Sequence, residues 1–116
     1  MTMQEIMRQR SFAVVGDTLN EEKFAAKIKK AMLKHGYEVH AVGKELSSLN
    51  EIEGDLDVID LCIRADKGLE LMKECKKPFK AVVIQPGASS EELESYLKEN
   101  NIPYVHNCLL MALGEH

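Results

Sequence analysis

The sequence predicts a single three-layer α/β domain, in which a five-stranded parallel sheet is covered by helices on both faces. Three observations lead to this fold class. Short β-branched apolar runs recur along the chain, amphipathic segments alternate with them, and 116 residues suffice for one domain with one core. Because strands that alternate with helices form βαβ units, consecutive strands are expected to run parallel. We treat residues 1–116 as this one domain.

Four of the apolar runs are continuous rather than alternating, as expected for strands buried on both faces of a parallel sheet. A fifth, weaker candidate covers residues 104–106 and follows Pro103. The segment 43–56 has room for a helical turn or two but not for another strand, so we expect the strand order 2-1-3-4-5. The four strong runs are residues 12–15, 39–42, 58–63 and 81–84.

Helical patterns fill the gaps between the strands. Gly36 follows the first pattern, as a glycine beyond a helix C-terminus would. Asp66 is the expected N-cap of the second pattern, and a capping box within Ser89–Glu92 precedes the third. Residues 1–10 have room for a short N-terminal helix. The three patterns run from Phe24 to His35, from Leu69 to Cys75 and from Leu93 to Asn100.

Composition and charge restrict the class of partner. A net charge of −4, dispersed lysines, 5% aromatic residues and no tryptophan disfavour nucleic acid. No apolar run approaches the roughly 18 residues that span a bilayer, and residues 1–10 lack the apolar stretch of a signal peptide. We therefore expect a cytoplasmic protein with no membrane partner. Cys62, Cys75 and Cys108 show no Cys-x-x-Cys spacing and are expected to be free thiols, with Cys62 buried inside the third strand.

In sheets of this order, ligands bind beyond the carboxyl ends of the strands, near the switch point between strands 1 and 3. Gly16 closes the first strand and allows a tight turn into a helix whose N-terminal amides attract phosphate. The alternative is an ordinary turn in which Thr18 and Glu21 form a capping box. Lys23 and Lys27 share one face of the first helix and either meet an anionic ligand or are solvated.

No catalytic or metal site is evident in the sequence, which favours a protein without enzymatic activity. The four histidines show no metal-ligand spacing, and neither a Gly-x-Ser-x-Gly motif nor a P-loop occurs. Cys108 is expected to be a buried, inert thiol rather than a reactive one. Asp57 is expected to start the third strand, whereas Asp60 lies within it and needs a partner. Only the first glycine of the dinucleotide fingerprint is present, which weakens an NAD(P) reading.

The segments at the strand ends match a known family when they are taken together. They are Val14-Val15-Gly16-x-Thr18 with Lys23, Val42-Gly43-Lys44, Asp57-Val58-Ile59-Asp60-Leu61, Ile84-Gln85-Pro86-Gly87-Ala88-Ser89 and Asn107-Cys108-Leu109. This succession resembles the small bacterial CoA-binding-domain proteins and, more distantly, the N-terminal domain of the succinyl-CoA synthetase α subunit. The resemblance covers about residues 11–110. Asp17 and the short segment 43–56 depart from the family pattern.

The resemblance implies a Rossmann-like fold and non-catalytic binding of a small-molecule nucleotide, namely coenzyme A (CoA), an acyl-CoA or a CoA-like nucleotide. An NAD(P)-binding Rossmann enzyme and a degenerate member acting as a protein-interaction module remain alternatives, and a homo-oligomer or another protein partner stays open. The implied residues are Gly16, Thr18, Leu19 and Lys23 for pantetheine and diphosphate, Val42, Gly43 and Lys44 for the nucleotide phosphates, Ile63 and Arg64 beside the adenine, and Ile84, Gln85, Pro86 and Gly87 as the floor.

Overall fold

The computed structural model describes residues 1–114 and contains a parallel sheet of five strands. The strands are β1 (Ser11–Gly16), β2 (Glu38–Gly43), β3 (Val58–Leu61), β4 (Ala81–Ile84) and β5 (Tyr104–His106). Their order in the sheet is β2-β1-β3-β4-β5, and every neighbouring pair is parallel. The predicted α/β fold class and strand order are therefore confirmed.

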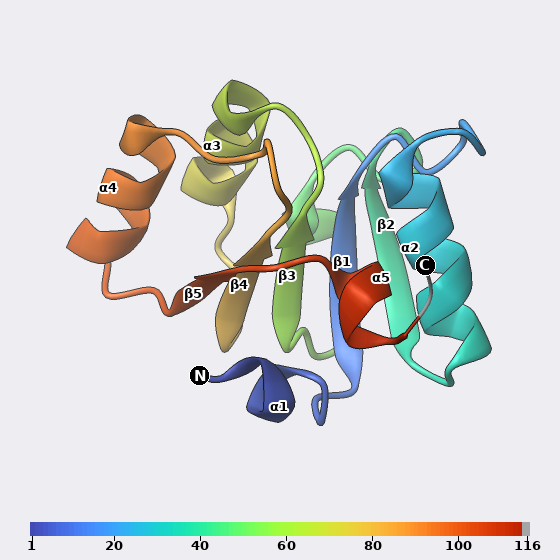
Figure 1. The fold of residues 1–116 in the computed structure, drawn as a ribbon. Coiled ribbons are helices and arrows are strands. Elements are labelled where there is room, and N and C mark those ends of the chain that lie inside the picture. The colour runs from blue at the N-terminus through green and yellow to red at the C-terminus, as the bar shows by residue number, and fades with distance from the viewer. Residues whose placement is uncertain (115–116) are drawn as a thin grey trace.

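Helices cover both faces of the sheet (Figure 1). One face carries α3 (Ala65–Glu74), α4 (Glu91–Glu99) and the 3-10 turn η1 (Leu49–Glu51). The other face carries α1 (Met3–Ile6), α2 (Phe24–Lys34) and α5 (Leu109–Ala112). Because successive side chains of a strand point to opposite faces, each face has its own apolar core. No helix among residues 1–114 is long and apolar enough to cross a bilayer.

The three central strands, β1, β3 and β4, are buried along their whole length, as their continuous apolar runs predict. The segment between β2 and β3 holds η1 and a single bridge between Val42 and Leu46. It contains no further strand among the described residues, which confirms the expectation for this segment.

The C-terminus of α2 is the predicted one. Gly36 follows the C-cap residue His35 and has a φ of +89°, a conformation that a glycine adopts without strain. Its amide donates to the carbonyl of Leu33, and the amide of Tyr37 donates to that of Met32. These two hydrogen bonds form a Schellman motif, which satisfies carbonyls at the end of the helix.

The capping of α2 differs from the expectation. The helix begins at Phe24, with Lys23 as its N-cap. Thr18 and Glu21 form no capping box, because the Thr18 hydroxyl donates instead to the Glu45 carboxylate, at 2.5 Å. The Thr18 hydroxyl thus bonds to Glu45, which is 27 residues away in the sequence, and does not cap the helix.

Two further helix starts need smaller corrections. The N-cap of α3 is Arg64, and the predicted cap Asp66 lies in the first turn. α4 is capped by Ser90, whose hydroxyl accepts a hydrogen bond from the Leu93 amide at 3.1 Å. Because the third helical position is a leucine, the reciprocal half of a capping box is missing.

β3 ends at Leu61, two residues earlier than predicted, so Cys62 lies just after the strand rather than inside it. Its amide still donates to the carbonyl of Val15 at 2.8 Å, which keeps the residue aligned with the sheet. The Cys62 side chain is only partly buried, contrary to the expectation, because the sheet gives way to a pocket at this point. All three cysteines are free thiols.

Candidate functional site

The carboxyl ends of the central strands carry two neighbouring pockets. The first, which we call the β4-side pocket, has a volume of about 360 Å³ and is lined mainly by Lys23, Phe24, Cys62, Gln85 and Pro86. The second, the β2-side pocket, has a volume of about 520 Å³ and is lined mainly by Gly16, Gly43, Lys44, Lys67 and Leu71. Asp17 and Ile63 line both pockets and therefore mark the boundary between them.

The two pockets bring together most of the residues that the sequence selects. Lys23, Ile63, Arg64, Gln85, Pro86 and Gly87 line the β4-side pocket, and Gly16, Gly43, Lys44 and Ile63 line the β2-side pocket. Four selected residues line neither. Val42 and Ile84 are fully buried in the sheet core, Thr18 is buried, and Leu19 is 65% exposed. Their proposed contacts with a ligand remain predictions.

Gly16 and Gly43 are required by the packing of the strand ends. A Cβ atom on Gly16 would lie 2.3 Å from the Cys62 carbonyl oxygen and 2.8 Å from the Cβ of Ala25. A Cβ atom on Gly43 would lie 2.7 Å from the Gly16 carbonyl oxygen. Both distances to oxygen are too short for any other residue, so these glycines let adjacent backbones approach closely. The turn at Gly16 thus has a structural cause besides any ligand.

The loop after β1 is organised by Asp17. One carboxylate oxygen of Asp17 accepts hydrogen bonds from the amides of Leu19 and Asn20, each at 3.1 Å. Local bonds of this kind are typical of aspartate in turns. The Leu19 amide, which the sequence places at a diphosphate, therefore already has a carboxylate partner.

Glu45 fixes the same loop from the other side. Its carboxylate accepts from the Lys29 ammonium at 2.8 Å and from the Thr18 hydroxyl. These bonds, first that of Lys29 and then that of Thr18, lower the pKa of Glu45. The cluster of Thr18, Lys29 and Glu45 joins the loop after β1, the helix α2 and the segment after β2, so it holds the wall of the site in place.

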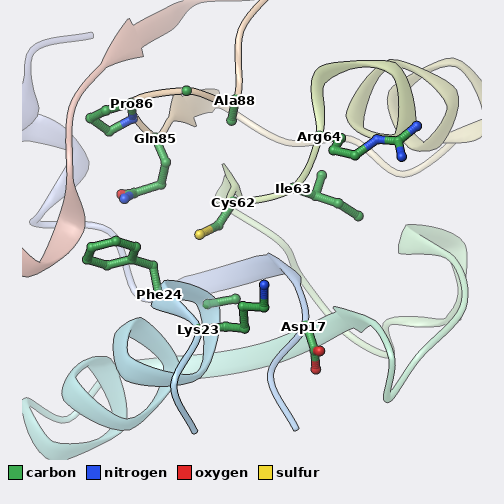
Figure 2. Close-up of a pocket in the computed structure, with 11 residues that line it drawn as sticks. Asp17, Lys23, Phe24, Cys62, Ile63, Arg64, Gln85, Pro86 and Ala88 are labelled. Carbon is green, nitrogen blue, oxygen red and sulfur yellow. The ribbon is translucent and has the colours of Figure 1, made fainter. Parts of the chain in front are cut away.

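The N-terminus of α2 opens on the β4-side pocket. Its N-cap, Lys23, makes no side-chain capping bond, and Phe24 and Ala25 from the first turn line the pocket. Figure 2 shows the ammonium end of Lys23 directed into the space below Cys62 and Ile63. The positive end of the helix and a lysine therefore face the same space, an arrangement that favours an anion.

Arg64 is turned away from the pocket, along α3 (Figure 2). Its guanidinium donates to both carboxylate oxygens of Asp66, at 2.6 Å and 3.1 Å. This pair lowers the pKa of Asp66 to about 2 and raises the pKa of Arg64. The charge of Arg64 is thus already paired with a carboxylate, which leaves Lys23 as the more accessible cation of the β4-side pocket.

The inner wall of the β4-side pocket is uncharged. Burial, followed by the proximity of Asp60 and Cys108, raises the pKa of the Cys62 thiol to about 12. The thiol is therefore protonated at neutral pH and is a weak nucleophile. Gln85 is also buried, and its side chain bonds to the start of α5: Oε1 accepts from the Leu109 amide at 3.1 Å, and Nε2 lies 3.4 Å from the Cys108 sulfur.

Several pocket residues were not selected from the sequence, among them Phe24, Cys62 and Lys67. Cys62 stands two residues after Asp60, hence on the same strand face, and this spacing is a signal that would have found it. No sequence signal singled out Phe24 and Lys67, which line the pockets from the first turns of α2 and α3. Among residues 1–114, no group of three or more His, Cys, Asp or Glu side chains is arranged to hold a metal ion.

Comparison with known proteins identifies the family. A family model described as a CoA binding domain matches residues 10–114. The chain belongs to this CoA-binding-domain family. The resemblance recognised in the strand-end motifs is thereby confirmed, and the family indicates a small-molecule ligand. A search of functionally curated proteins gives no significant match.

Solved structures of similar proteins support the same fold. A conserved hypothetical protein from Pyrococcus furiosus is 31% identical, with a TM-score of 0.81, and the match covers 90% of this chain and 99% of that one. Prb, a protein redesigned for binding, is 25% identical with a TM-score of 0.84, over 100% of this chain and 95% of that one. A Thermus thermophilus protein at 22% identity and a TM-score of 0.75, over 98% and 97% of the two chains, shares the fold.

Proposed function

We propose that this member of the CoA-binding-domain family binds CoA or an acyl-CoA without catalysing a reaction, with the ligand lying across both pockets. The observation that carries the proposal is that the two pockets adjoin and share Asp17 and Ile63 as lining residues. CoA is an elongated molecule with a phosphorylated nucleotide at one end and a less polar pantetheine arm at the other. A site divided into two adjoining compartments suits such a ligand.

The chemistry of each compartment supports one orientation. The β2-side pocket is lined by Lys44 and Lys67 but also by Glu70 and Glu74, and Lys67 pairs with Glu70 at 3.5 Å. Lys44 is therefore the cation of this pocket that would meet the nucleotide, beside the glycine-ended strands. The β4-side pocket is lined by Phe24, Cys62 and Pro86 and suits the pantetheine arm. The diphosphate between them lies near Lys23 and the uncapped N-terminus of α2 rather than at the Leu19 amide, because Asp17 engages that amide.

The residues around the β4-side pocket favour binding over catalysis. The Cys62 thiol is held protonated, and Arg64 is paired with Asp66. General acid–base catalysis requires a group whose pKa is close to the working pH and which reaches the reacting atom. The described pocket residues provide no such acid–base pair, so the proposal includes no chemical step.

A thermal-shift panel of CoA, acetyl-CoA, NAD, NADP and ATP tests the proposal. A ligand at 100 times its Kd stabilises the folded protein by about 2.7 kcal/mol, which is a readily measured shift. We expect stabilisation by the two CoA compounds and a smaller effect of ATP. A larger shift with NAD or NADP would support the dinucleotide alternative, and no shift with any compound would support the interaction-module alternative.

A further inference from the structure

Asp60 is a buried acid that the proposed binding site does not use directly. It lies in the middle of β3, between Val14 of β1 and Val83 of β4 in register. Its side chain is 0% exposed, and neither carboxyl oxygen has a hydrogen-bond partner among the described residues. A buried polar group without a partner is costly, so its presence requires an explanation. Burial raises the pKa of Asp60 well above the ordinary value, which favours the neutral acid.

Asp60 lies directly beneath the wall of the β4-side pocket. Side chains two residues apart on a strand share a face and are separated by about 6.6 Å, so Cys62 is the next side chain above Asp60. Cys62 lines the pocket, and Gln85, which continues β4 beside it, lines the pocket too (Figure 2). Asp60 is therefore separated from the pocket by a single layer of side chains.

The groups that face Asp60 offer no compensating charge. β1, β4 and α2 contribute apolar side chains to this core, and α5 contributes Leu109. The Cys62 thiol on the same strand is a titratable neighbour of Asp60, and Cys62 in turn lies near Cys108 at the N-cap of α5. Ionised Asp60 would consequently need water, and Cys62, the partly buried next side chain on the same strand face, lies between Asp60 and the pocket.

The residues that close this side of the pocket are held by few hydrogen bonds. α5 is a helix of one turn, and its start is attached to β4 through the two side-chain bonds of Gln85. Gln85 follows β4 two residues after Val83, the register partner of Asp60, and Leu109 belongs to the same core, so we expect hydration of Asp60 to disturb the bonds of Gln85 with Cys108 and Leu109. A ligand that fills the pocket covers the same residues and opposes this disturbance.

We propose that Asp60 is a positioning residue of the β4-side pocket, whose neutral form keeps Cys62, Gln85 and the start of α5 packed as the pocket wall. Ionisation of Asp60 loosens this wall. By linkage, a ligand that prefers the packed wall binds more tightly when Asp60 is protonated, so affinity falls as the pH rises. This inference rests on the proposed function, because it names CoA as the ligand of that pocket.

Calorimetric titration with CoA between pH 6 and pH 9 tests the inference. The variant is Asp60→Asn, which is neutral at every pH, and the matched control is Asp55→Asn, which removes an exposed carboxylate before β3. Titration of CoA itself affects all three proteins equally and cancels in the affinity ratios. We expect the parent and the control to lose at least fivefold more affinity over this range than Asp60→Asn. Parallel pH profiles for all three proteins would overturn the inference.

A measurement without ligand separates this inference from the proposed function. Hydrogen exchange of residues 105–113, corrected for the intrinsic rate, should be faster at pH 9 than at pH 6 in the parent. The apolar variant Asp60→Val, which also serves if Asp60→Asn does not fold, should show no such increase. Equal exchange in parent and variant would overturn the role of Asp60, whereas absence of CoA binding at every pH would overturn only the proposed function.

Discussion

Gly16 combines a packing role at the strand ends with a position in the proposed binding site. Its hydrogen side chain lets the Cys62 carbonyl approach, and its position at the end of β1 places it in the β2-side pocket. The sequence suggested a phosphate-binding turn at this glycine, and the packing of the strand ends explains the same glycine without a ligand. Stability measurements therefore separate the two roles better than binding measurements alone.

Gly16→Ala should lower the free energy of unfolding by more than about 2 kcal/mol, because the new methyl group would overlap backbone and φ is +155°. Gly68→Ala is the matched control. Gly68 lies inside α3, and a Cβ atom there would be 3.5 Å from its nearest neighbour, so alanine should be neutral or stabilise by up to about 1 kcal/mol. Urea unfolding followed by circular dichroism measures both. A mild effect of Gly16→Ala would show that the strand ends separate easily.

Lys23→Ala and Lys44→Ala should each weaken CoA binding about tenfold or more, since charge-assisted hydrogen bonds contribute roughly 1.5–3 kcal/mol when shielded from water. The net charge of −4 offers no general positive field to replace them. Lys30→Ala, an exposed lysine of α2 outside both pockets, is the control. Calorimetric titration at two salt concentrations measures the change, which should shrink as salt rises. Parent-like affinity in both variants would refute the phosphate placement.

Asp17→Ser should strengthen CoA binding. The substitution removes a carboxylate from the boundary between the two pockets and weakens its hold on the Leu19 and Asn20 amides, which then point at the ligand. The same titration measures the effect. Weaker binding by this variant would mean that the Asp17 turn shapes the loop for the ligand and that its charge is secondary.

At the scale of elements, the sequence predicted what depends on local pattern. The five strands, their order and the glycine-terminated end of α2 follow from apolar runs and from Gly36. The start of α2 at Phe24 agrees with the predicted pattern, but the alternative capping box at Thr18 does not form, because Thr18 is bound by Glu45. The predicted cap of α3 was wrong, since Asp66 lies in the first turn and is bound by Arg64. The Glu45 contact joins residues 27 positions apart, and no spacing rule reports such a contact. The pocket residues Phe24 and Lys67 were missed because no local pattern reports that the first turns of α2 and α3 face the pockets.

Ser90→Ala should lower the free energy of unfolding by about 1 kcal/mol, because it removes the hydrogen bond that caps α4. Ser95→Ala is the control, since Ser95 is an exposed residue within the same helix, where alanine is the better helix former. Urea unfolding of the two variants gives the comparison. Equal stabilities would indicate that water replaces the cap at this helix end.

At the scale of the whole molecule, two carboxyl groups, Asp57 just before β3 and Asp60 inside it, make opposite contributions to the dependence of stability on pH. Burial alone would raise the pKa of Asp57, but hydrogen bonds from the Ser11 and Arg10 amides, together with Lys80, outweigh it and lower the pKa. Asp57 therefore stabilises the folded protein at a pH above the pKa of this group in the unfolded chain, and this stabilisation is lost as the pH falls through the folded pKa. Asp60 acts in the opposite sense, since burial raises its pKa.

The stability of the protein should consequently decrease as the pH rises from about 4 towards neutrality and beyond. Below an unfolded pKa of about 3.9, Asp60 is protonated in both states and its contribution is fully present. Above that pH the unfolded chain releases this proton and the folded chain keeps it, which lowers stability by up to about 1.4 kcal/mol per pH unit until the folded pKa is reached. Asp60→Val should remove this decrease and unfold at a higher urea concentration than the parent at pH 8. Urea unfolding at pH 5, 6.5 and 8 measures the difference. Asp57→Asn is the control, because it should not change how stability varies with pH over this range. If the free energies of unfolding of the parent and Asp60→Val instead differ by the same amount at all three pH values, Asp60 does not remain protonated in the folded protein. Water would then have to reach the centre of the sheet.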